Sequence, residues 1–233
     1  YNNHPIDGVC EKLQHISNGK KGNIPFPIIR LGNDDKVAEA LEYIQRLYES
    51  TKSINIYEET LKKRKSDRIA RTRQLTALLQ EYEERLKLFE TKEAILSLME
   101  SNKHLTFQTQ LQGIQLAQVE DKISKSKDYT DEEALNLILE DEDAFKSYLY
   151  YTSAKCIKRI QEPKNADLLD IVTMEDKEEK VKAFNDYLRN DENLKKFQRI
   201  FPIIATTSIS AHKVGKPGVH FDMVVMDEAS QGN

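Results

Sequence analysis

Two adjacent carboxylates near the end of the sequence, Asp227 and Glu228, have the residue types and the position that nucleoside-triphosphate chemistry requires. They follow the apolar run Phe221–Met226, in which Val224 and Val225 suit a parallel strand that is covered on both faces. Asp227 then stands at the carboxyl end of that strand, where open α/β sheets place their ligands. One carboxylate can hold Mg²⁺ there while its neighbour polarises an attacking water.

A strand that ends in a solvated acidic turn is the alternative interpretation of these residues. The sequence contains no Gly-x-x-x-x-Gly-Lys-Ser/Thr loop, the element that cradles nucleotide phosphates. Mg²⁺ and ATP are therefore expected to bind only in a longer parent protein that supplies such a loop. For the 233 residues alone we expect no bound cofactor and no ATP hydrolysis. The five histidines and two cysteines show no metal-ligand spacing.

Four stretches of the sequence resemble one protein family. The string DEASQ at Asp227–Gln231 is similar to motif II, the Walker B element, of superfamily 1 helicases, P-loop NTPases, in the branch of the nonsense-mediated-decay RNA helicase. The others, which follow that family's order, are NNHPID at Asn2–Asp7 (motif Ia), PIIRLG at Pro27–Gly32 (a strand) and IIATTSISA at Ile203–Ala211 (a strand and a nucleic-acid-contacting loop). Asn2 and Pro5 depart from the usual motif Ia, which has serine and a small residue at those positions.

The resemblance implies an ATP-dependent helicase or translocase that acts on single-stranded DNA or RNA. In it, Asp227 would hold Mg²⁺ and the nucleotide, Glu228 would be the general base, and Gln231 would couple nucleotide state to movement. Phosphates of the nucleic acid would be contacted by Asn3, Thr206, Thr207 and Ser208. The family's Walker A would precede Tyr1, and its motif III and second RecA-like domain would follow Asn233, so the chain is expected to be a fragment of a larger motor.

Composition limits the classes of protein and of partner. The net charge of −4 gives no global bias towards nucleic acid, so any binding surface must be local. The two cysteines, Cys10 and Cys156, lie far apart in the sequence, which argues against a disulfide framework. No apolar run approaches the ~20 residues of a membrane span. We expect a cytoplasmic or nuclear protein with no membrane partner.

Helix breakers divide the chain into flanks and interior. Of the eight glycines and six prolines, only Gly113 and Pro163 lie between Asn33 and Phe201. This predicts an α/β fold with predominantly helical content: a RecA-like parallel sheet in two parts, residues 1–33 and 201–233, interrupted by a helical, coiled-coil-like insertion at 34–200. The strands Pro25–Leu31 and Phe201–Thr206 are expected to be adjacent and parallel.

Inside the insertion, apolar spacing predicts long helices. Asp34 and Asp35 are expected to cap the first helix. A second helix is expected from about residue 55 to Ser101, with a reversal at 101–103 and an antiparallel return. The predicted seam of the second helix is Leu75, Leu79, Tyr82, Leu86, Phe89 and Leu96, and that of the returning helix is Leu105, Leu111, Ile114, Val119 and Ile123.

The second helix begins with a basic stretch. Residues 62–73 contain seven basic residues and one acid, and Lys62, Lys63, Arg64 and Arg68 are candidates for contact with nucleic-acid phosphates. A solvated coiled-coil surface is the alternative, because no aromatic residue is interleaved for stacking on bases.

Two functions from different classes follow. The first is a piece of an ATP-dependent helicase or translocase. The second is a coiled-coil module on a RecA-like remnant, in which the helical insertion binds a protein partner. A Walker A element upstream in the parent gene and arginine-bearing motifs downstream would favour the motor.

Overall fold

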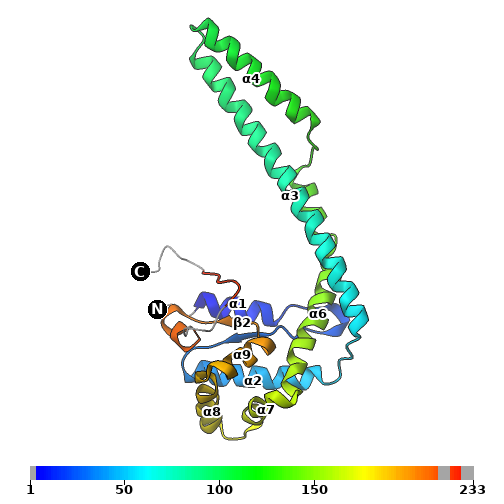
Figure 1. The fold of residues 1–233 in the computed structure, drawn as a ribbon, viewed down its shortest axis with the longest axis vertical. Coiled ribbons are helices and arrows are strands. Elements are labelled where there is room, and N and C mark those ends of the chain that lie inside the picture. Colours follow the sequence, from blue (N-terminus) through cyan, green and yellow to red (C-terminus); the bar gives the residue numbers. More distant parts are fainter. Residues whose placement is uncertain (1–3, 215–220, 227–233) are drawn as a thin grey trace. The chain divides into compact units, whose positions relative to one another are not determined.

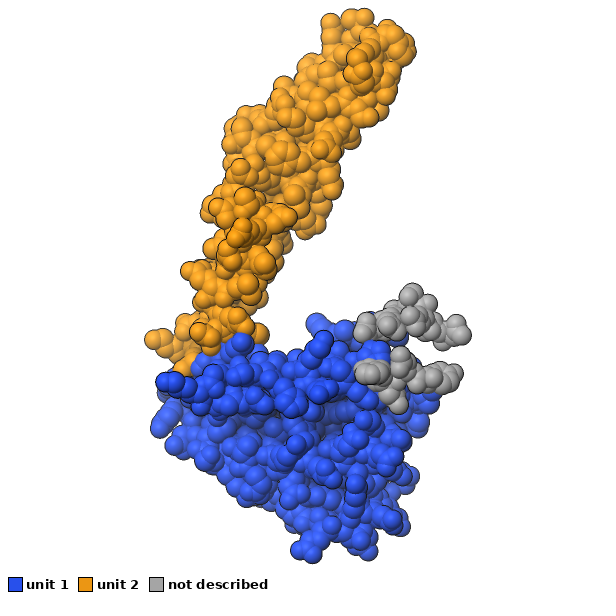
Figure 2. All heavy atoms as spheres, turned by 180° about the vertical axis from the view of Figure 1, so that it is seen from behind, with its two compact units in different colours: residues 1–61, 146–233 blue, residues 62–145 orange. Residues whose placement is uncertain are grey.

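The structure, a computed structural model, describes residues 4–214 and 221–226. The described part is mostly helical and contains a small parallel sheet of two strands, so the expected α-dominant α/β class is confirmed (Figure 1). The chain divides into two compact units, coloured separately in Figure 2. Unit 1 comprises residues 1–61 and 146–233, and unit 2 comprises residues 62–145. The expected insertion, residues 34–200, is therefore divided between the two units. Residues 34–61 and 146–200 are part of the unit that contains the strands, and residues 62–145 form the other unit.

The two strands come from segments far apart in the sequence. Strand β1 (Ile28–Arg30) pairs in parallel with β2 (Ile203–Ala205), with Ile28 opposite Ile203 and Arg30 opposite Ala205. β1 is buried along its whole length, as its continuous apolar sequence predicts. The expected adjacency of the strand segments that flank the helical interior is therefore confirmed.

The N-cap of helix α2 (Asp34–Thr51) lies one residue before the predicted cap. The side chain of Asn33 accepts a hydrogen bond from the Lys36 amide at 3.1 Å, which makes Asn33 the N-cap. Asp34 and Asp35 lie in the first helical turn, where carboxylates interact favourably with the helix dipole. The predicted cap was wrong by one position, because asparagine and aspartate are equally good N-caps and the sequence offers all three in a row.

A single core holds unit 1 together. It joins β1 and α2 to three helices of the other chain segment, α7 (Ala166–Thr173), α8 (Lys177–Arg189) and α9 (Asp191–Ile200). Phe184 and Phe197 meet edge to face at a centroid distance of 5.5 Å, and Phe201 lies 4.9 Å from Phe197. Aromatic pairs at these distances favour association beyond the area that they bury. The remaining elements of this unit are listed here with their bounds: α1 (His4–Gln14), η1 (Gly19–Lys21), α6 (Glu142–Lys158, which begins in unit 2), η2 (Arg159–Gln161), η3 (Pro163–Asn165) and η4 (Ser208–Lys213).

Unit 2 is a helical hairpin. Helix α3 (Glu58–Ser101) ends at the predicted reversal point, and α4 (Thr106–Lys125) returns beside it. The two helices are joined by an ion pair between Lys92 Nζ and Glu120 Oε1 at 2.8 Å, and by a hydrogen bond from Arg85 to the Ile123 carbonyl at 2.9 Å. The predicted hairpin is confirmed. Helix α5 (Asp131–Leu139) follows with a capping box formed by Thr130 and Glu133, so the acidic residues there stabilise the start of the helix.

The predicted seam of the hairpin was wrong in part. Leu75 and Tyr82 lie on the less exposed face of α3, but four other predicted members are exposed: Leu79, Leu86, Phe89 and Leu96. The less exposed positions are instead 61, 64, 68, 71, 75, 78, 82, 85, 88, 92, 95 and 99. Several of them are Arg or Lys, whose aliphatic stems can pack while their charged ends reach a partner. The prediction considered only apolar residues, and it therefore selected the neighbouring face of the helix.

The returning helix shows a similar difference. Leu105, Leu111 and Ile114 are exposed, whereas Val119 and Ile123 are half-buried, as expected. Thr109, Gln112, Gly113 and Leu116 occupy the less exposed positions nearer the hairpin turn.

The segment Phe221–Met226 forms no strand, which corrects the expectation of a buried strand there. Val224 and Val225 are 75% and 84% exposed. A buried strand needs a hydrogen-bonded neighbour and cover on both faces. Within the described residues, β1 and β2 pair only with each other, and neither provides such a neighbour for this segment.

Candidate functional site

The candidate site lies on the side of the sheet where both parallel strands have their carboxyl ends; this side is called the carboxyl edge below. The ladder extends one residue past β1, because the Leu31 amide donates to the Ala205 carbonyl at 2.9 Å. Gly32 therefore follows on one strand and Thr206 on the next, at the same edge. The carboxyl ends of neighbouring parallel strands are the usual position of ligand sites in α/β sheets.

Three of the predicted nucleic-acid contacts come together in the loop after β2. Thr206 and Thr207 are half-buried, and Ser208 is exposed. Thr207 is the N-cap of η4, since its hydroxyl accepts from the Ser210 amide at 3.4 Å. At the other end of η4, Lys213 donates to the Gly32 carbonyl at 2.5 Å, which fastens the loop to the end of β1.

A cluster of ion pairs lies at the same end of the sheet and joins α1 to β1 and α2. Asp7 Oδ1 lies 2.8 Å from Arg30 Nε, and Asp7 Oδ2 lies 3.4 Å from Lys36 Nζ. Arg30, which is buried, also donates to the Leu31 carbonyl. Asp7 thus connects α1, β1 and α2 at this edge. Sequence reasoning assigned no role to these residues, although a charged residue inside an apolar strand signals a buried partner.

The cluster sets the charge state of Asp7. Burial alone would raise the pKa of this carboxyl, but hydrogen bonds and charges of Arg30 and Lys36 together outweigh burial and lower the pKa below its usual value. A carboxylate with a lowered pKa in the folded state stabilises the fold above its unfolded pKa of about 3.9. That contribution is lost as the pH falls through the folded-state pKa.

We therefore expect Asp7→Asn to lower the free energy of unfolding at pH 7 and to have a smaller effect near pH 3, where the wild-type carboxylate begins to protonate. Hydrogen exchange of peptides from unit 1, at increasing urea concentrations and at each pH, measures this difference in both proteins. Asp170→Asn, at an exposed position on α7, is the matched control and should change little at either pH. An Asp7→Asn effect of the same size at both pH values would contradict the assigned pairing.

The residues predicted to do the nucleotide chemistry lie outside the described residues. These are Asp227, Glu228 and Gln231, together with the predicted nucleic-acid contact Asn3. Their roles stay predictions. In the described part of the chain, no group of three or more His, Cys, Asp or Glu side chains is arranged to hold a metal ion.

The basic stretch of α3 is partly paired with acidic residues of its own unit. Arg71 Nε lies 2.5 Å from Asp141 Oδ2, and Arg68 Nη2 lies 3.7 Å from the same oxygen. Arg71 also donates to the Leu137 carbonyl at 2.7 Å. Lys62 and Lys63 are exposed, while Arg64 is half-buried. Arg68 and Arg71 thus connect α3 to the segment that contains α5, and contact of the basic stretch with nucleic acid stays a prediction.

Comparisons with known proteins return no match, whether with protein-family models, with curated proteins or with solved structures. Among the described residues, none of the helices combines the length and the apolar character that crossing a membrane requires.

Proposed function

We propose that the chain is part of an ATP-dependent nucleic-acid translocase or helicase. The observation that carries this proposal is the parallel pairing of β1 with β2. It brings the Thr206–Ser208 loop and Gly32 to one strand edge, and the sequence DEASQ follows about twenty residues after that loop. Hydroxyls and backbone amides at the carboxyl ends of parallel strands are suited to bind phosphate oxygens, which fixes register and reads no base sequence.

The side-chain chemistry and the family resemblance suggest the roles. Asp227 would hold Mg²⁺ and the nucleotide, and Glu228 would act as the general base that deprotonates the attacking water. By resemblance, Gln231 would couple the nucleotide state to movement. Thr206, Thr207 and Ser208, with Asn3, contact the backbone of a single strand of DNA or RNA. The segment from Thr207 to Lys213 is held at both ends, by the cap at Thr207 and by the hydrogen bond from Lys213 to the Gly32 carbonyl. Binding of a phosphate there therefore costs little free energy for ordering the loop.

This function requires a phosphate-cradling loop, and the 233 residues contain no such motif. The parent protein must therefore supply it, and the present chain alone is inactive in this proposal. The test is Mg²⁺-dependent ATP turnover by the parent protein, measured with and without single-stranded DNA and RNA.

A protein-docking arm is the second candidate, and exposed apolar residues of unit 2 favour it. On α3 they are Leu79, Leu86, Phe89 and Leu96, and on α4 they are Phe107, Leu111 and Ile114. Exposed apolar patches on helices are typical of surfaces that bind other proteins. A parent protein that turns over no ATP, with or without a single strand, would favour this second function over the first.

A further inference from the structure

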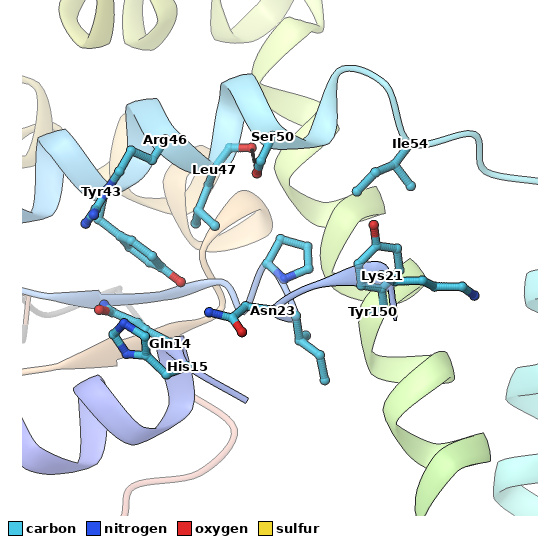
Figure 3. A pocket seen from close by; sticks show the side chains of 12 residues that line it. Gln14, His15, Lys21, Asn23, Tyr43, Arg46, Leu47, Ser50, Ile54 and Tyr150 are labelled. Carbon is cyan, nitrogen blue, oxygen red and sulfur yellow. Dashed lines mark hydrogen bonds between the residues drawn. The ribbon is translucent and has the colours of Figure 1, made fainter. Parts of the chain in front are cut away.

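A cavity of about 360 Å³ lies in unit 1, away from the site described above. It is formed by the end of α1, the loop that leads into β1, the second half of α2 and one residue of α6 (Figure 3). Ile24 and Pro25, which precede β1, belong to its lining, so the cavity adjoins the amino end of the strand. The Thr206–Ser208 loop, in contrast, follows the carboxyl end of β2. The volume of the cavity falls within the usual range of small-ligand sites, roughly 300–1,000 Å³.

Three side chains of basic type line this cavity. They are His15, Lys21 and Arg46, and none of the lining residues is acidic. Arg46 and Lys21 are exposed at its rim. The Arg46 guanidinium lies 5.8 Å from the centre of the Tyr43 ring. The labelled side chains of Arg46 and Lys21 lie at opposite ends of the cavity (Figure 3). A cavity whose lining holds basic side chains and no carboxylate favours an anionic ligand.

Lys21 is held in place by its loop and by two aromatic rings. The loop is closed by a hydrogen bond from the Asn18 amide to the Gly22 carbonyl at 2.8 Å, with Gly22 at φ +79°. The Lys21 ammonium lies 4.7 Å from the centre of the Tyr151 ring and 5.8 Å from that of Tyr150, and it donates to the Tyr151 hydroxyl at 3.0 Å. These contacts hold the Lys21 ammonium beside two aromatic rings, an arrangement that favours a cation.

A second cavity of about 330 Å³ adjoins the first, since Lys21, Ile54 and Tyr150 line both. Tyr57 and Tyr151 also line the second cavity, and Tyr57 is 70% exposed. A tyrosine ring that stays exposed beside a lysine offers a flat face for stacking. The two cavities therefore form one groove with cations along it and three tyrosines at one end.

We propose that this groove binds nucleotide units, with Lys21 and Arg46 on phosphates and Tyr57 and Tyr150 stacked on bases. Cations that follow a backbone and aromatic rings that receive bases are the two elements of single-strand binding. The contacts named are sequence-tolerant, because every base has a flat face and every phosphate a charge. The groove would bind either a single-stranded nucleic acid or a free nucleotide. Binding in this groove does not require ATP hydrolysis, which the proposed function places at the carboxyl ends of the strands.

The test is fluorescence anisotropy of the 233-residue chain with a labelled single-stranded oligonucleotide of about 12 residues, within the usual site size. Lys21→Gln combined with Arg46→Gln should weaken binding at least ~10-fold and lower the slope of log K against log salt by about 1.4, roughly 0.7 for each phosphate contact on a single strand. Tyr57→Leu should weaken binding at least ~5-fold with an unchanged slope, because one stacking contact is lost.

Matched controls separate these effects from misfolding and from general charge. Lys20→Gln removes the neighbouring exposed lysine, which lines neither cavity, and Tyr129→Leu removes a tyrosine of unit 2. Both should bind as the wild type does, and circular dichroism should show all variants folded.

Competition identifies the source of the nucleotide. An unlabelled oligonucleotide that displaces the probe, where AMP does not, indicates a strand site, and displacement by AMP as well indicates a site for free nucleotides; both outcomes support the proposal. Displacement by inorganic pyrophosphate as effective as by the oligonucleotide would show a site for phosphate alone and would overturn it. Unchanged affinity in the Lys21, Arg46 and Tyr57 variants would overturn it too.

Discussion

Replacing Glu228 by glutamine in the parent protein is expected to lower the turnover number for ATP by roughly 10²–10⁴, the usual contribution of a positioned general base. Binding of Mg-ATP should stay near the wild-type level, because the metal ligand Asp227 is retained and glutamine has nearly the shape of glutamate. A loss in turnover without a loss in binding is the signature of a group that acts mainly in the transition state. Single-turnover kinetics and fluorescent-nucleotide titration measure the two quantities separately.

Asp227→Ala is the companion variant. It removes the metal ligand, so it should weaken binding of Mg-nucleotide as well as hydrolysis. Wild-type hydrolysis by both variants would refute the assignment of the acidic pair, and so would a Glu228→Gln variant that fails to bind nucleotide.

Replacing Ile95 by aspartate is expected to destabilise the helical hairpin of unit 2 by about 3 kcal/mol or more, because it places an unpaired charge in an apolar contact. Ile95 is 8% exposed on α3, whereas its neighbour Leu96 is 44% exposed. Leu96→Asp is the matched control, since both changes introduce the same side chain at adjacent positions in the last turns of the same helix. It should cost below ~1 kcal/mol, in the range of surface substitutions.

Hydrogen exchange of peptides from α3 and α4 measures this effect within unit 2, where a global unfolding curve would mix two compact units. Protection of α4 should be lost in Ile95→Asp and kept in Leu96→Asp. Equal losses in the two variants, or a larger loss in Leu96→Asp, would mean that the hairpin packs on the flank that contains Leu79 and Leu86.

The fold could be predicted where the signal is local. The absence of glycine and proline between Asn33 and Phe201, with two exceptions, predicted the helical interior. The apolar segments on either side predicted the strands β1 and β2, and residues 101–103 predicted the turn of the hairpin. Each of these depends on the backbone preferences of a few adjacent residues.

Side-chain environment was harder to predict. The packed face of α3 includes Arg71, Arg85 and Lys92, which pair with residues far along the chain, and sequence periodicity cannot identify such partners. The same limit applies to the groove, because Lys21, Arg46 and Tyr150 come from three separate segments. Nothing in the sequence distinguishes Tyr150 from a residue that packs one helix against another, and only the fold places it beside a lysine.

ATP turnover by the parent protein, followed as phosphate release with and without single-stranded DNA or RNA, tests the proposed function most directly. The proposal predicts Mg²⁺-dependent turnover that increases with the concentration of a single strand and reaches a plateau, and that Glu228→Gln lowers by roughly 10² or more. No turnover under any of these conditions, or turnover that neither DNA nor RNA changes, would contradict it.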